Sequence, residues 1–178
     1  KTACLSSKRR LDFSSNSYLE GLMKTITIFL MACFILASCQ PNNQSDVSKE
    51  LAINTLKAFY ANLDVDTYGS KEWLELVTSD FKVFEAGKQM DLAAFLQFSK
   101  PSDDLAETNW TFSALDVTLD GSSAHISYLN DGLFRHSNIE VKLKWMESVL
   151  LVMDEGVLKV KFLNSNLLER QIIDLDGN

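Results

Sequence analysis

The sequence predicts an α+β fold in which three N-terminal helices pack on one face of an antiparallel sheet. Apolar residues recur at helical spacing between Val47 and Leu63, whereas apolar and polar residues alternate as in strands after Asn109. The 178 residues are 46% hydrophobic and 23% charged. This length and balance are typical of a single globular domain.

The first helix is expected over residues 47–63, with Ser45 or Asp46 as its N-cap and Glu50 in its first turn. Its apolar stripe comprises Ala52, Leu56, Phe59, Tyr60 and Leu63.

A second, short helix is expected to begin after Ser70, to carry Trp73 and to end at residues 78–80. A strand over 81–85 follows it, with Gly87 in the turn.

The third helix is predicted over residues 92–98, capped by Asp91. Met90 and Phe95 occupy the two positions of a hydrophobic staple, and Pro101 stops the helix.

The rest of the chain has the pattern of an antiparallel meander. Apolar residues alternate first in one phase and then in the other, at Trp110, Phe112 and Ala114 and then at Leu115, Val117 and Leu119. This phase change predicts a β-bulge, which bends a sheet. Asp120-Gly121 predicts a hairpin turn into a strand over 124–134.

The closing hairpin is expected to run from a strand over 145–153, beginning near Val141, through Glu155-Gly156 into a strand over 157–163. Strict alternation predicts three inward-facing residues in that last strand, namely Leu158, Val160 and Phe162.

Residues 23–38 have the three parts of a secretory signal: a positive start at Met23-Lys24, the apolar run 26–37 and a small-residue cleavage site. A transmembrane helix is the alternative, but this run spans about 18 Å as a helix, whereas a bilayer core needs about 30 Å. Residues 1–22 are interpreted as an upstream translation artefact or a fragment end, or else as a long positive region of the signal.

Leu36-Ala37-Ser38-Cys39 resembles the lipobox of bacterial lipoproteins, which implies acylation of Cys39 after cleavage. Two or three acyl chains would anchor the domain stably, with residues 39–46 as a tether. Gln40 follows the cysteine, which in such lipoproteins implies an outer-membrane site facing the periplasm.

The charge and the cysteine content exclude several classes of function. Net charge is −7 without a basic stripe, which argues against nucleic-acid binding. No cysteine follows Cys39, so the folded part has no disulfide and no thiol nucleophile. Two histidines, with no cysteine after Cys39, argue against a zinc site, and no metal and no cofactor are predicted.

The chain over residues 47–170 resembles the nuclear transport factor 2-like superfamily, which includes ketosteroid isomerases and SnoaL-like polyketide cyclases. The matching pieces are the end of the first helix, 56–60, the strand and turn 80–87 followed by Asp91, and the closing hairpin 145–165. The resemblance implies three helices on a strongly curved antiparallel sheet that forms a cone, with residues 171–178 as a tail. Many relatives have His-Ser where this chain has Asn164-Ser165, which weakens the case for acid–base chemistry there.

The cone of this fold encloses a pocket, for which the sequence offers seven lining residues: Tyr60, Trp73, Phe84, Phe95, Trp110, Tyr128 and Asn164. The simpler interpretation is that the aromatic residues fill the core. Because the sequence offers aromatic pocket residues without an assembled nucleophile or acid–base pair, the favoured function is non-catalytic binding of a small apolar or mixed-polarity ligand, or of a partner. A homodimer through the sheet is also expected.

An enzyme of isomerase, dehydratase or hydrolase type is the rival hypothesis. Glu85 or Glu147 would be its base and Tyr60 or Tyr128 its hydrogen-bond donor, because both acids lie in apolar strand contexts that raise a carboxyl pKa. The alternative is that both acids face solvent. This hypothesis requires a carboxylate and a hydroxyl that converge within about 3 Å inside the cone.

Overall fold

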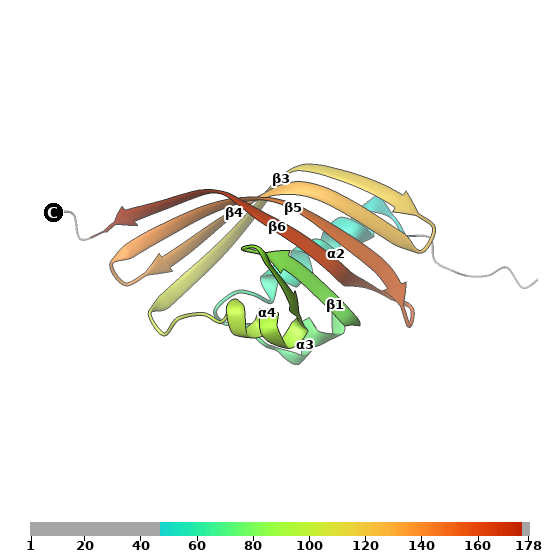
Figure 1. Ribbon diagram of the computed structural model, residues 1–178, viewed down its shortest axis with the longest axis horizontal. Helices are drawn as coiled ribbons and strands as arrows, with labels where there is room; N and C mark the ends of the chain where they lie inside the picture. The colour runs from blue at the N-terminus through green and yellow to red at the C-terminus, as the bar shows by residue number, and fades with distance from the viewer. Residues whose placement is uncertain (1–46, 176–178) are drawn as a thin grey trace, which may run out of the picture. The chain divides into compact units, whose positions relative to one another are not determined.

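The computed structural model describes residues 47–175, which form a curved six-stranded sheet arched over three helices (Figure 1). The elements are α2 Lys49–Ala61, α3 Lys71–Glu75, β1 Val77–Glu85, β2 Lys88–Asp91, α4 Leu92–Phe98, β3 Leu105–Asp120, β4 Ser123–His136, β5 Ile139–Asp154 and β6 Val157–Asp174. The predictions for the signal segment, Cys39 and the tether lie outside the described residues. No helix within 47–175 has the length and apolar character needed to cross a bilayer.

The strand order is β2-β1-β6-β5-β4-β3. The pairs β3–β4, β4–β5 and β5–β6 form the predicted antiparallel meander. β1 joins this meander by pairing in parallel with β6, a connection that the sequence pattern did not predict. The α+β class and the curved sheet are confirmed.

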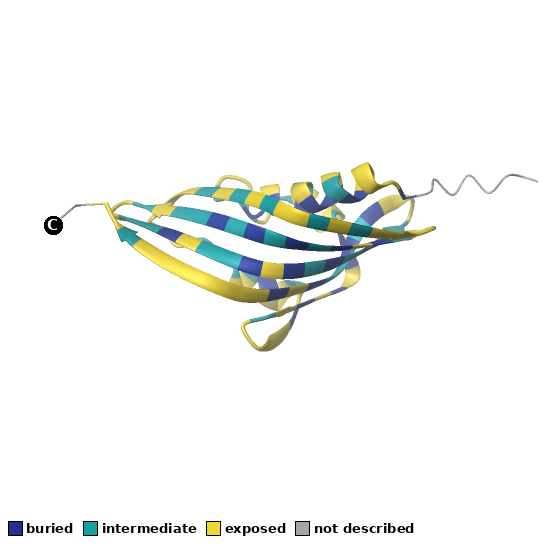
Figure 2. Cartoon of the chain, turned by 90° about the horizontal axis from the view of Figure 1, so that it is seen from above, coloured by how far each residue is buried: buried dark blue, intermediate teal, exposed yellow. Residues whose placement is uncertain are grey.

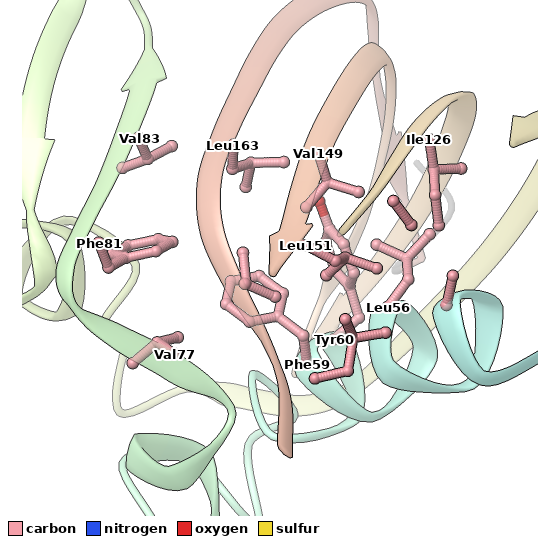
Figure 3. Packing of buried hydrophobic residues seen from close by; sticks show 14 of the residues in the cluster. Leu56, Phe59, Tyr60, Val77, Phe81, Val83, Ile126, Val149, Leu151 and Leu163 are labelled. Atoms are coloured by element: carbon pink, nitrogen blue, oxygen red, sulfur yellow. The ribbon is translucent and has the colours of Figure 1, made fainter. Parts of the chain in front are cut away.

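The long helix α2 packs its apolar stripe against the concave face of the sheet (Figure 3). Leu56 and Phe59 are fully buried there, opposite Val149 and Leu151 of β5. The helix begins later than predicted because the hydroxyl of Ser48 accepts the Leu51 N–H at 3.1 Å and forms the N-cap.

The region after α2 is partly as predicted. Ser70 caps α3 as expected, but the helix ends at Glu75 and β1 begins at Val77, four residues before the predicted start. The β-branched residues at the end of the expected helix, Val77 and Thr78, are buried in this strand instead. β2 was not predicted, since its alternation extends over four residues only.

The cap and the staple of α4 are confirmed. The carboxylate of Asp91 accepts the Ala94 N–H at 2.9 Å, and Met90 and Phe95 are both buried. These residues fix the N-terminal turn of α4.

β3 contains the predicted bulge. Ala114 has a φ of 51°, and the register to β4 shifts between Ser113 and Asp116. The extra residue explains why Trp110 and Leu115 face the same side although they are five positions apart. The strand itself begins at Leu105, earlier than predicted.

Two register shifts between β5 and β6 were not predicted, one between Lys144 and Trp145 and one between Leu150 and Leu151. The second of them changes which residues of β6 face inward. The register to β5 shifts so that Leu150 pairs with Phe162 and Leu151 pairs with Val160. Leu163 is therefore buried and Phe162 faces the other side, which corrects the predicted inward position of Phe162. Buried and exposed residues alternate along the strands in Figure 2. β6 also extends to Asp174, far beyond the predicted end.

Candidate functional site

A pocket of about 290 Å³ opens between the sheet, α2 and the segment that follows α4. Its lining is mostly apolar, with a polar end formed by Tyr60, Glu85, Asn130 and Glu147. The remaining lining residues are Leu63, Phe95, Phe98, Ser99, Lys100, Pro101, Leu105, Thr108, Trp110, Phe134, Leu143, Trp145 and Leu163. Such a site suits a small molecule with one polar group.

Strand register builds the polar end. Tyr128, Glu147 and Ser165 are direct cross-strand neighbours on β4, β5 and β6. Phe84 of β1 pairs with Asn164 of β6, so Glu85 comes level with Ser165 in the same row. Side chains in one row of a sheet point to the same face, which brings the two acids together.

Glu147 is 4% exposed and is held by three hydrogen bonds. Its Oε2 accepts the Tyr60 hydroxyl at 2.6 Å and Asn130 Nδ2 at 3.1 Å, and its Oε1 accepts the Ser165 hydroxyl at 2.7 Å. Burial raises the pKa of Glu147, and the hydrogen bonds from Tyr60, Ser165 and Asn130 act against that rise.

The phenol groups behind this carboxyl belong to the same network. The hydroxyl oxygens of Tyr60 and Tyr128 lie 3.2 Å apart. Burial and the neighbouring Glu147 charge raise the pKa of both phenols well above the usual value. Both tyrosines are therefore neutral hydrogen-bond donors at any physiological pH.

Glu85 is half-buried and contributes the second carboxyl of the pocket. Burial raises its pKa to about 7, the Glu147 charge adds to the rise, and a hydrogen bond from the Trp145 side chain opposes it. A carboxyl with this pKa exchanges protons near neutral pH, as a general acid or base must.

Aromatic rings form the apolar wall. The ring centroid of Trp110 lies 5.3 Å from that of Phe134 and 6.1 Å from that of Trp145. Gly132 lies beneath these rings, and a Cβ there would come within 2.8 Å of the Trp145 ring. Glycine is thus required at this position for the rings to pack.

The structure brings together some of the seven residues predicted to line the pocket. Tyr60, Phe95 and Trp110 line it, whereas Tyr128 lies behind it against Tyr60.

The other three residues were predicted wrongly as lining. Trp73 is fully buried in the core, where its Nε1 donates to the Phe59 carbonyl at 3.1 Å. Phe84 is 41% exposed on the opposite face of the sheet, where its ring centroid lies 5.5 Å from that of Phe162. Asn164 is exposed because the second register shift, in β6, turns Ser165 inward instead.

Sequence reasoning missed Asn130, Ser165 and Trp145 as site residues. Asn130 follows the inward row of Ala124, Ile126 and Tyr128 in phase, which was the available signal. Its side chain is 1% exposed, and its Oδ1 is a buried acceptor without a partner among the described residues. Within residues 47–175, no three His, Asp or Glu side chains gather closely enough to hold a metal ion.

Comparisons with known proteins identify the fold only. No family model and no curated protein matches the sequence. A nuclear transport factor 2-like protein from Cytophaga hutchinsonii superposes with a TM-score of 0.57 at 10% identity, over 68% of this chain and 99% of its own.

Two further solved structures agree with this. A putative scytalone dehydratase from Novosphingobium aromaticivorans gives a TM-score of 0.56 at 12% identity, over 68% of this chain and 85% of its own. A putative ketosteroid isomerase from Shewanella frigidimarina gives a TM-score of 0.50 at 17% identity, over 65% of this chain and 94% of its own. The described chain therefore has the nuclear transport factor 2-like fold that the sequence resemblance implied.

Proposed function

We propose that this domain binds a small, mostly apolar molecule that carries one polar group. The observation that carries the proposal is the pocket itself, in which an aromatic and aliphatic wall leads to a polar end with an unpaired Asn130 Oδ1. A buried acceptor without a partner costs about 1–3 kcal/mol, which a donor on a bound molecule would recover.

A pair of leucines on β3 gives the test. Leu105 lines the pocket, whereas Leu119 is 44% exposed near the other end of the strand. The purified full chain is incubated with a metabolite and lipid extract, and native mass spectrometry identifies what it retains. Leu105→Trp should lose the retained molecule and Leu119→Trp should keep it. Retention of nothing by the wild type, or equal retention by both variants, contradicts the proposal.

Proton-transfer catalysis is a second candidate function, supported by one specific observation. The Tyr60 hydroxyl and the Glu147 carboxyl lie 2.6 Å apart at the end of a pocket that also holds Glu85. Solved structures with this fold include proteins named as an isomerase and a dehydratase. Catalysis would appear as exchange of an acidic C–H proton of a bound carbonyl compound for deuterium, and it would be lost in Glu85→Gln.

We also propose that the domain is exported and lipid-anchored through Cys39 in the bacterial outer membrane, facing the periplasm. The lipobox-like residues 36–39 at the end of an apolar run support this. A homodimer through the sheet stays a prediction. The exposed Phe84 and its neighbour Phe162, on the face opposite the pocket, support it.

A further inference from the structure

The hydrogen-bond donors at the polar end of the pocket are already bonded to another side chain of the protein, Glu147. The Tyr60 hydroxyl, the Ser165 hydroxyl and Asn130 Nδ2 all donate to Glu147. A ligand that approaches this end therefore meets side chains whose donor groups are already committed to a carboxylate.

The groups that remain for a ligand are acceptors. Asn130 Oδ1 belongs to a side chain that is 1% exposed and lines the pocket, and it has no partner among residues 47–175. The Glu85 carboxyl lines the same pocket and is a second acceptor there. Two acceptors at the polar end of a mostly apolar pocket select a ligand with N–H or O–H donors.

Among residues 47–175, neither the Glu85 nor the Glu147 carboxyl forms an ion pair with a basic side chain. The basic residue of the lining is Lys100, which is exposed on the loop after α4. Buried carboxylates without a counter-charge are destabilised, so a positive charge on the ligand would be favoured.

The wall of the pocket also suits a cation. Trp110, Phe134 and Trp145 present indole and phenyl rings to the same space in edge-to-face and tilted contacts. Tryptophan faces attract ammonium groups most strongly among side chains, and the attraction grows when water is excluded.

We infer that the pocket takes a small amine: an apolar or aromatic body whose protonated primary or secondary amino group donates to Glu85 and to Asn130 Oδ1. The inference rests on the proposed ligand-binding function and names its ligand class. The raised pKa of Glu85 agrees with it, because a carboxyl that lacks a cation holds its proton longer.

Three probes of similar size and different charge test the inference. Binding of 2-phenylethylamine, 2-phenylethanol and phenylacetate to the purified full chain is measured by calorimetry at pH 8. We expect the amine to bind at least about tenfold more tightly than the alcohol, since a hydrogen bond between charged groups adds about 1.5–3 kcal/mol, and the carboxylate to bind most weakly.

Glu85→Gln should reduce the preference for the amine to less than about threefold while it keeps alcohol binding, because the amide retains the shape of the side chain without its charge. The matched control is Glu75→Gln, which removes the same charge from an exposed residue at the end of α3 and should keep the full preference. Near-UV circular dichroism confirms that both variants are folded.

The outcomes separate the two proposals. Equal binding of amine and alcohol, or an amine preference that survives in Glu85→Gln, overturns the inference and leaves the binding function standing. If the folded wild type binds none of the three probes and retains nothing from the extract, both proposals fail.

Discussion

At the scale of single residues, the two acids of the pocket have different tasks. Both oxygens of Glu147 accept hydrogen bonds from the protein, so this carboxyl organises Tyr60, Asn130 and Ser165 and has little capacity left for a substrate proton. Glu85 lies at the same end with its pKa near neutrality. Any proton that moves to or from a bound molecule would therefore pass through Glu85.

The pKa of Glu85 predicts a pH-dependent stability difference. Its folded-state pKa of about 7 exceeds the ordinary 4.5, so the folded state holds a proton that the unfolded state has lost. Its contribution to stability therefore falls as pH rises from 4.5 to 7. The Glu85→Gln variant has no carboxyl here to lose its proton, so we expect its free energy of unfolding to rise by about 3 kcal/mol relative to wild type between about pH 4.5 and about pH 8.5.

Urea unfolding of both proteins at the two pH values gives this difference. Glu75→Gln serves as the control because Glu75 is exposed, and its effect should be the same at both values. A Glu85→Gln effect that does not change with pH would show that Glu85 titrates normally in the folded protein.

At the scale of elements, the bulge in β3 and the register shifts between β5 and β6 decide which side chains reach the pocket. In β3, Ala114 and Leu115 together face Tyr128 of β4, between the pairs on either side of the shift. Ala114 adopts a left-handed φ of 51°, which is unfavourable for a residue with a Cβ. The bend in β3 therefore carries backbone strain at Ala114, next to the Tyr60–Tyr128 pair.

Deletion of Ala114 should leave the protein folded with a straighter β3. Without this residue, Phe112 and Leu115 are two positions apart and both still face inward, and the ladder to β4 becomes regular. We expect the free energy of unfolding to change by less than about 2 kcal/mol, because the loss of the bend is offset by removal of the strained residue. Ligand retention should fall as the curvature changes.

Deletion of Thr111 from the same strand is the matched control. It places Trp110 next to Phe112, so one of the two rings must face solvent. This variant should lose cooperative thermal unfolding in circular dichroism. If the two deletion variants show the same thermal unfolding, the bulge at Ala114 does not determine which side chains of β3 face inward.

The same register shifts explain how far the sequence could predict the molecule. The helices, their caps at Ser70 and Asp91 and the bulge at Ala114 leave local signals in spacing and in capping residues. The register shift near Lys161 in β6 leaves no such signal in the sequence. Val160, Phe162 and Leu163 are all apolar, so the sequence pattern allows either Phe162 or Leu163 to face inward.

The site was predictable only in part. Glu85 and Glu147 stood out as acids in apolar strands, but which face they occupy depends on pairing. Tyr60 and Glu147 are 87 positions apart, and their contact depends on how α2 packs against the sheet. Spacing along the sequence does not show this. Asn164 was chosen in place of Ser165 because a one-residue shift exchanges the two faces of a strand.

At the scale of the whole molecule, the chain enters the domain at the end of the sheet opposite the pocket mouth. The Val47 N–H donates to the Gly121 carbonyl at 3.2 Å, at the β3–β4 turn. Leu105 at the mouth begins the same strand, which at 16 residues is roughly 50 Å long.

The lipid anchor is tested by paired cysteine variants. Expressed in a bacterium that processes lipoproteins and grown with radioactive palmitate, the wild type and Cys33→Ala should be labelled and should fractionate with membranes. Cys39→Ala should be unlabelled, because Cys39 supplies the thiol that is acylated whereas Cys33 lies within the apolar run. Labelling of Cys39→Ala would contradict the anchor.

The place of β6 in the sheet has a consequence for biosynthesis. β1 is one of the first elements along the chain, yet it reaches the meander only through β6, which ends at Asp174. The sheet of the nascent domain cannot be completed until β6, through Asp174, has been translated. The parallel β1–β6 pair therefore forms late in synthesis, although β1 is made early.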